Sequence, residues 1–162
     1  MANLFSVAFT LQADPAIGGA ARCHFQLASA GSSVPTRLLK VSAKTNGAAW
    51  DLQQRSALCT GGTPAVPTAP KGVIARHTDP AIAPQAVLTY YGNGAAHGGV
   101  LAGTGKLLKV LTTSVIAGSI DTMVDWFESP SGLLLPTATD GIVLVSNAVD
   151  TVGSFEVFWL EG

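Results

Sequence analysis

The sequence SFEVFWL, residues 154–160, is the clearest strand in the chain and directs the interpretation of the fold. Successive side chains of a strand point to opposite faces, so alternate residues share a face. One face carries the large apolar side chains of Phe155, Val157 and Trp159. The other face carries Phe158 and Leu160 beside Glu156. A strand that is apolar on both faces is typical of the centre of a packed sheet or of a surface that a neighbouring subunit covers.

The chain also has few charges for its size. Hydrophobic residues make up 48% of its 162 residues and charged residues 12%, with a net charge of −1, whereas about 25% of residues are charged in an ordinary globular domain. A soluble monomer normally covers its surface with charged side chains. We therefore expect other copies of the chain or another partner to bury part of the apolar excess. The candidate residues of an interface between copies are Phe155, Val157, Phe158, Trp159 and Leu160.

Period-2 alternation continues in Arg22–Ala28 and Arg37–Lys44, as expected of half-buried strands. Their apolar faces are predicted to consist of Cys23, Phe25 and Leu27 in the first segment, and of Leu39, Val41 and Ala43 in the second. Five further segments have the composition of strands, namely Leu4–Leu11, Ala86–Tyr91, Leu107–Thr113, Met123–Glu128 and Gly141–Ser146. Ala48–Thr60 fits either a strand or one short helix.

Glycine and proline interrupt the whole chain. There are 18 Gly and 9 Pro, and the longest stretch without either is Ala48–Thr60. Helices of average length have little room between these residues, whereas strands fit throughout. We predict an all-β fold, a β-sandwich of two antiparallel sheets, in which residues 1–162 form a single domain. Its long loops are expected at Gly61–Gly72 and Gly92–Gly105.

Composition and hydropathy argue against two classes of partner. The chain has no basic excess that could displace counterions from phosphates, so no nucleic acid is expected. The most apolar stretch, Leu107–Ile120, is interrupted by Lys109 and small polar residues. It falls short of the about 20 apolar residues that a membrane-spanning helix needs, so no membrane is expected either. The N-terminal residues lack the basic region and long apolar core of a signal peptide.

No motif predicts catalysis or a cofactor. Gly103–Lys106 (GTGK) resembles part of a phosphate-binding loop, but Val100 stands where that loop requires glycine and Leu107 where it requires Ser or Thr. A glycine-rich turn that enters a strand explains these residues better. On one strand, Asp121 and Asp125 would lie roughly 13 Å apart, too far for a glycosidase pair, although carboxylates of different strands can converge. We therefore expect no enzyme activity and no cofactor.

The candidate metal ligands are equally sparse. The three histidines are scattered at His24, His77 and His97. A zinc site needs three or four ligands at recognisable spacing, so no metal site is predicted. An ion shared on a threefold axis would need only one ligand from each copy. Cys23 and Cys59 are interpreted as reduced, partly buried side chains, and they could pair only if the fold brings them together.

Two adjacent tyrosines close a predicted strand beside the glycine-rich loop, so one ring is expected to face inward and the other outward. An exposed Tyr at the mouth of a loop can stack on a sugar or anchor a protein contact. The alternative is that it packs against its own loop. The candidate residues for contact with a partner or ligand are Tyr90, Tyr91, Pro64 and Pro67.

Over most of the chain, a series of features follows in a fixed order: the strand pair Arg22–Ala28 and Thr36–Thr45, the loop Thr60–Pro64 (TGGTP), the turn His77–Pro80 (HTDP), Pro84–Tyr90 (PQAVLTY), Met123–Glu128 (MVDWFE), Leu135-Pro136, Gly141–Val145 (GIVLV) and the terminal segment Gly153–Glu161. This order resembles that of the small jelly-roll trimers of tailed bacteriophages that decorate or cement capsid shells. The resemblance implies a jelly-roll topology and a homotrimer. It also implies a non-enzymatic structural role on a virion that is assembled in the host cytoplasm, with the capsid protein of the same virus as partner.

Two alternatives stay open at this point. One is a receptor- or glycan-binding jelly-roll module of a phage tail or fibre, which would use Tyr90, Tyr91 and the loop Gly92–Gly105. The other is an enzyme of the cupin or lyase kind on a similar fold. That enzyme would need inward-facing His and Glu ligands at close spacing, and the sequence has no such motif.

Overall fold

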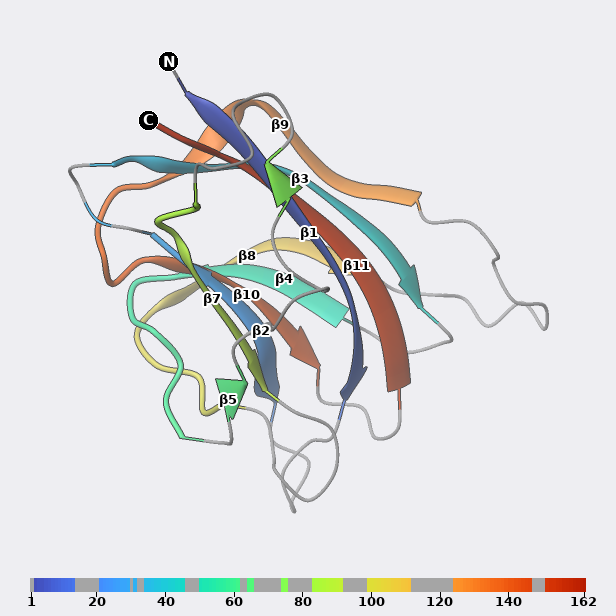
Figure 1. The fold of residues 1–162 in the computed structure, drawn as a ribbon. Helices are drawn as coiled ribbons and strands as arrows, with labels where there is room; N and C mark the ends of the chain where they lie inside the picture. The colour runs from blue at the N-terminus through green and yellow to red at the C-terminus, as the bar shows by residue number, and fades with distance from the viewer. Residues whose placement is uncertain are drawn as a thin grey trace.

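The computed structural model describes residues 2–13, 21–29, 31, 34–45, 50–61, 64–65, 74–75, 83–91, 99–111, 124–146 and 151–162. These residues form strands and no helix (Figure 1). The strands are β1 (Asn3–Ala13), β2 (Arg22–Ala28), β3 (Thr36–Thr45), β4 (Trp50–Arg55), β5 (Pro64–Ala65), β6 (Ile74–Ala75), β7 (Val87–Tyr91), β8 (Gly105–Leu111), β9 (Val124–Leu135), β10 (Gly141–Ser146) and β11 (Thr151–Glu161).

The strands form two sheets that pack face to face. Sheet A has the order β6-β1-β11-β3-β9, and sheet B has the order β5-β7-β2-β10-β4-β8. All of the strand pairs described are antiparallel. Without the two-residue strands β5 and β6, the sheets have four and five strands. The prediction of an all-β sandwich with two antiparallel sheets is confirmed.

The strand order is that of a jelly roll. Sheet A contains β1-β11-β3-β9 and sheet B contains β2-β10-β4-β8, so the chain crosses between the sheets at most steps. Two interlocked Greek keys produce this order. β1 pairs with β11 along its whole length, from Asn3 opposite Glu161 to Ala13 opposite Thr151. The first and last strands, and with them the two chain ends, therefore lie side by side (Figure 1).

The core lies between the sheets and is rich in aromatic rings. Phe9 stacks on Phe25 with 4.5 Å between ring centroids, and Trp50 meets Phe155 edge-on at 5.1 Å. β11 supplies Phe155, Val157 and Trp159, each at most 1% exposed. Because β11 lies between β1 and β3, the interpretation of this strand as the centre of a packed sheet is confirmed.

A bulge in β2 corrects the predicted face of Cys23. Phe25 lies opposite Leu144 and Cys23 opposite Val145, so His24 is an extra residue in the ladder. A bulge of this kind inverts the alternation beyond it. The His24 ring consequently meets Trp50 edge-on at 5.6 Å. Cys23 joins a second apolar cluster on the outer face of sheet B instead of packing with Phe25.

A second bulge, in β3, corrects the predicted face of Leu39. Trp159 lies opposite Leu38 and Phe158 opposite Lys40, which leaves Leu39 as the extra residue. Leu38 is therefore fully buried in the core with Val41, and Leu39 is half-buried towards the outer face. Two adjacent leucines, Leu38 and Leu39, interrupt the alternation at this point, and the pairing of β3 with β11 decides which of them faces the core.

Two other expectations are settled by strand pairing. Residues 50–55 form the strand β4 between β10 and β8, so the alternative of a short helix in Ala48–Thr60 is wrong. β9 continues to Leu135, beyond the predicted end at Glu128. Most of the predicted loop Gly61–Gly72 lies outside the described residues, as does 92–98 of the loop Gly92–Gly105.

Candidate functional site

An open groove lies on the outer face of sheet A, where β9 leaves its regular register with β3. Lys40 pairs with Glu128 and Leu38 with Leu133, so the four residues 129–132 of β9 lie opposite the single residue Leu39. Gly132 allows the strand to return, since its φ of +74° is in the left-handed region that favours glycine. β9 lies at one edge of sheet A, and an edge is where a strand can accommodate such a long bulge and its proline.

The groove has a volume of about 390 Å³ and a largely apolar lining. Its floor comes from the outward-facing side chains of β1, β3 and β11, and one wall comes from the bulge of β9. The lining residues are Leu4, Leu39, Lys40, Glu128, Ser129, Pro130 and Phe158. The long side chain of Lys40 lies over the Phe158 ring, with Nζ 5.7 Å from the ring centroid. This contact combines cation–π attraction with packing of the lysine methylene groups.

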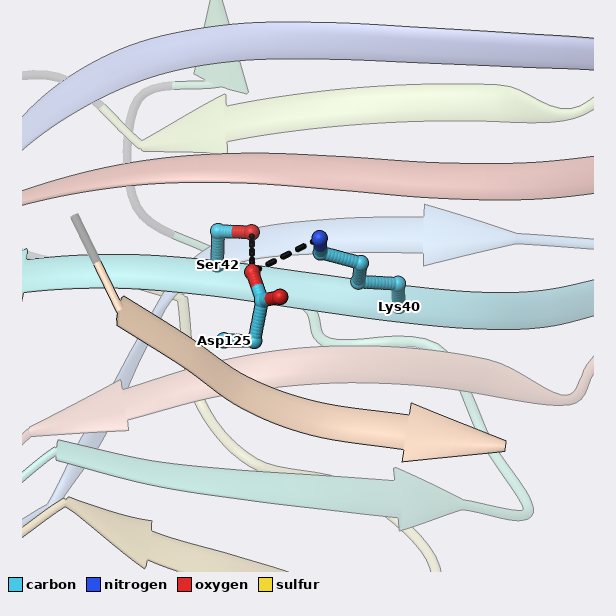
Figure 2. Close-up of polar contacts among 3 residues, drawn as sticks. All are labelled: Lys40, Ser42 and Asp125. Atoms are coloured by element: carbon cyan, nitrogen blue, oxygen red, sulfur yellow. Dashed lines mark hydrogen bonds and ion pairs between the residues drawn. The ribbon is translucent and has the colours of Figure 1, made fainter. Parts of the chain in front are cut away.

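An ion pair joins β3 to β9 beside the groove (Figure 2). Lys40 Nζ lies 2.7 Å from Asp125 Oδ1, and the Ser42 hydroxyl donates a hydrogen bond of 2.8 Å to the same oxygen. The hydrogen bond to Asp125 raises the pKa of Lys40. The hydrogen bonds from Lys40 and then from Ser42 lower the pKa of Asp125. Both groups are therefore charged at neutral pH.

The chemistry of this cluster favours binding or structure over catalysis. A serine becomes a nucleophile when a neighbouring base removes its proton. Asp125 is a weakened base because Lys40 holds it ionised, and Ser42 is only 6% exposed. Asp121, the other carboxylate considered from the sequence, lies outside the described residues. The ion pair instead places two charged side chains at the edge of an apolar groove.

The structure divides the five predicted interface residues of β11 between two faces. Phe155, Val157 and Trp159 are in the core of the sandwich, so they cannot contact another copy in the folded chain. This corrects their assignment to an interface. Phe158 and Leu160 are half-buried on the outer face of sheet A, and Phe158 lines the groove. These two residues are available to a partner.

The predicted tyrosine contacts are largely inside the protein. Tyr91 is 3% exposed and donates a hydrogen bond of 3.2 Å to the carbonyl of Cys59. Tyr90 packs on the other face of β7 against Phe9, with 4.9 Å between ring centroids. The two rings lie on opposite faces of β7, as expected, with Tyr90 towards the core and Tyr91 on the outer face of sheet B. Other residues cover Tyr91, however, so it is not the exposed contact residue that was considered. Pro64 lies in β5, of whose side chains nothing is described, and Pro67 lies outside the described residues.

The remaining motifs have structural roles where they are described. Gly103 has a φ of +63°, and Gly105 begins β8, so the interpretation of Gly103–Lys106 as a turn that enters a strand is confirmed. His24 is buried, and His77 and His97 lie outside the described residues. No group of three or more His, Cys, Asp or Glu side chains that could hold a metal ion occurs within the described ranges.

The groove itself was missed from the sequence. The SPSG segment, residues 129–132, was not predicted as part of a strand because proline and glycine usually end one. Leu133–Leu135 after it could have indicated that the strand resumes beyond a bulge. No local pattern could have placed Leu4 of β1 beside this segment.

Comparison with known proteins identifies no relative: no family model, no curated protein and no solved structure matches the chain. A search of the described residues for a helix long and apolar enough to cross a membrane also finds none.

Proposed function

We propose that this chain is a non-enzymatic virion structural protein, a capsid decoration or cement protein that binds and stabilises a phage shell as a homotrimer. The observation that carries the proposal is the apolar patch around the groove on the outer face of sheet A, with Leu4, Leu39 and Phe158. The central strand of this sheet, β11, directs Phe158 and Leu160 away from the core, in a chain of which only 12% of residues are charged. The jelly-roll strand order and the order of motifs along the chain support the same assignment.

The outer face of sheet A has the properties of a subunit interface. Leu4, Leu39 and Phe158 surround an open groove, and the ion pair of Lys40 and Asp125 lies at its margin. An apolar centre with a polar rim is the usual arrangement of protein interfaces. Burial of this apolar surface by a neighbouring copy contributes roughly 25 cal/mol per Å² before the cost of association is subtracted.

A trimer makes weak contacts with a shell effective. Each copy presents the same loops, so a trimer on a symmetry axis binds three equivalent sites at once. The second and third contacts form at high effective concentration, and three modest affinities therefore produce tight attachment. This mode of binding requires an assembled lattice, because free shell subunits do not hold three sites at the right spacing.

The first test is the mass of the protein in dilute solution. Light scattering after size-exclusion chromatography should give about three times 16.5 kDa. The protein should co-sediment with assembled shells of the same virus and not with free shell subunits. A stable monomer of 16.5 kDa at micromolar concentration, or equal binding to free subunits, would contradict the proposal.

The variant Phe158→Glu tests the interface on sheet A. A glutamate here lies beside Lys40, so the chain should still fold, but a buried charge in the interface should convert the trimer to monomer. Val87→Glu is the matched control, because Val87 is 58% exposed on β7 of sheet B. The control should keep the mass of a trimer and the unfolding midpoint of the parent. Retention of the trimer by a folded Phe158→Glu would exclude this face as the interface.

A further inference from the structure

The fold brings together the two cysteines of the chain, which are 36 positions apart in sequence. Cys23 lies near the start of β2 and Cys59 follows β4, and both are free thiols at 0% and 8% exposure. They share a cluster on the outer face of sheet B with Tyr91, Val143 and Val145. The two residues are neighbours in this cluster, and the Cys23 thiol donates a hydrogen bond of 3.2 Å to the Phe25 carbonyl.

Backbone contacts hold both cysteines in place. The Cys23 N–H donates to the Gly99 carbonyl at 2.9 Å, and the Gly99 N–H donates to the Cys23 carbonyl at 2.8 Å. The Cys59 N–H donates to Gln26 Oε1 at 2.7 Å, and Tyr91 donates to the Cys59 carbonyl. Both cysteines are therefore held in defined positions within one cluster.

The two thiols differ in acidity. Burial raises the pKa of Cys23 well above its usual value, and the neighbouring Cys59 raises it further. The pKa of Cys59 is lowered, first by its hydrogen bond with Cys23 and also by the positive charge of Arg55. Arg55 is held near by hydrogen bonds from its guanidinium to the carbonyls of Ala102 and Gly103, at 2.7 and 2.8 Å. Cys59 is thus the thiol that ionises first and attacks first.

We propose that Cys23 and Cys59 form an oxidisable pair, which a small-molecule disulfide such as oxidised glutathione converts to an intramolecular disulfide. The Cys59 thiolate attacks one glutathione sulfur and releases the first glutathione as a thiolate. Cys23 then loses its proton and attacks Cys59 Sγ, which releases the second glutathione. The two protein thiols are oxidised to a disulfide, and oxidised glutathione is reduced to two glutathione molecules. The two protons of the protein thiols are taken up by the two glutathione thiolates. The proposal depends on the position of the thiols and not on the proposed function.

The disulfide would join β2 to the segment after β4 and so link two strands on either side of β10. A cross-link that closes a loop in the unfolded chain raises the stability of the folded state. Because Cys59 is nearly buried, the reaction should proceed through local opening of the residues that cover it, and it should be slower than the reaction of an exposed thiol.

The test uses the folded full chain, reduced and then incubated with oxidised glutathione. Titration of thiols after denaturation should fall from two to none, with a mass loss of two hydrogen atoms and no added glutathione. The urea midpoint should rise, and dithiothreitol should reverse the change. Cys23→Ser should accumulate one glutathione on Cys59, whereas Cys59→Ser should stay unmodified over the same period, because the remaining Cys23 thiol is fully buried.

Three results would overturn the proposal. The first is persistence of both thiols under conditions that fully oxidise a urea-unfolded sample. The second is a stable adduct of glutathione on the parent protein, which would show that Cys23 cannot reach Cys59. The third is a disulfide-linked dimer on a non-reducing gel. The measurements on the parent protein decide the matter even if neither serine variant folds.

Discussion

At the scale of single residues, the buried carboxylate of Glu161 connects the two sheets by hydrogen bonds. It is 3% exposed and accepts hydrogen bonds from the backbone N–H groups of Gln85 and Ala86, at 2.7 and 3.0 Å. The Trp159 indole donates a third, at 2.7 Å. Glu161 ends β11 in sheet A, whereas Gln85 and Ala86 lead into β7 in sheet B, so these bonds connect the two sheets.

Replacement of Glu161 by Gln should destabilise the fold. The amide has one oxygen acceptor in place of two and no charge, so at least one of the three N–H groups loses its acceptor. An unpaired N–H costs about 1–3 kcal/mol where it is buried. Urea unfolding followed by tryptophan fluorescence measures the change. Glu128→Gln is the control, because Glu128 is exposed, and it should change the midpoint little. Equal midpoints for Glu161→Gln and the parent would show that these hydrogen bonds contribute nothing net.

At the scale of elements, the long bulge of β9 creates the groove, and Gly132 makes the bulge possible. A Cβ atom at this position would lie 2.8 Å from Arg37 Cβ, and the φ of +74° is strained for any residue with a side chain. Gly132→Ala should therefore lower the free energy of unfolding by about 1–3 kcal/mol. Ser131→Ala, at an exposed neighbouring position, is the control for the measurement by thermal unfolding. A midpoint unchanged in Gly132→Ala would mean that the bulge adapts without strain.

The ion pair between β3 and β9 should make the folded protein sensitive to acid. The folded-state pKa of Asp125 is below its ordinary value of 3.8, so its contribution is present at neutral pH and is lost as pH falls through the folded pKa. Asp125→Asn removes this contribution at neutral pH. The difference in unfolding midpoint between parent and variant should be small, because Asp125 is 51% exposed. It should also shrink as pH is lowered towards 3. A difference in unfolding midpoint that grows as pH falls would contradict a folded-state pKa of Asp125 below its ordinary value.

At the scale of the whole molecule, the jelly roll places strands from the two ends of the chain next to each other. Asn3 pairs with Glu161, and the Gly162 N–H donates to the Pro35 carbonyl at 3.3 Å. Such pairing is slow to form, because the chain must close its longest loop before the contacts are made.

Joining the two ends by a short Gly/Ser linker should speed folding and stabilise the protein. Cyclisation removes part of the entropy of the unfolded chain, an effect of up to about 5 kcal/mol for a loop of this size. Stopped-flow refolding and urea midpoints measure both quantities. The control carries the same linker residues at its C-terminus without ligation. Refolding as slow as that of the control would indicate that the pairing of β1 with β11 forms after the rate-limiting step.

The local sequence determined the strands themselves. The predicted segments Arg22–Ala28 and Gly141–Ser146 coincide with β2 and β10. Period-2 alternation in the first segment and a short apolar run of β-branched residues in the second are local properties of a strand. The doubly apolar pattern of residues 154–160 predicted either the centre of a packed sheet or a surface that a neighbouring subunit covers, and β11 does lie in the centre of sheet A. Frequent glycine and proline, with strand-like segments between them, were enough to predict an all-β chain.

Only the tertiary structure decided which side of each strand faces the core at the bulges. His24 and Leu39 are each inserted by a shift in register, which depends on the hydrogen bonds of the neighbouring strand. The segment around His24 alternates without interruption, whereas the adjacent Leu38 and Leu39 leave open which of the two faces the core. The meeting of Cys23 with Cys59 follows from the first shift, and the groove follows from the bulge of β9 opposite Leu39. Local alternation predicts which residues of a strand share a face. The position of a bulge, beyond which the two faces exchange, depends on pairing with strands that are remote in sequence.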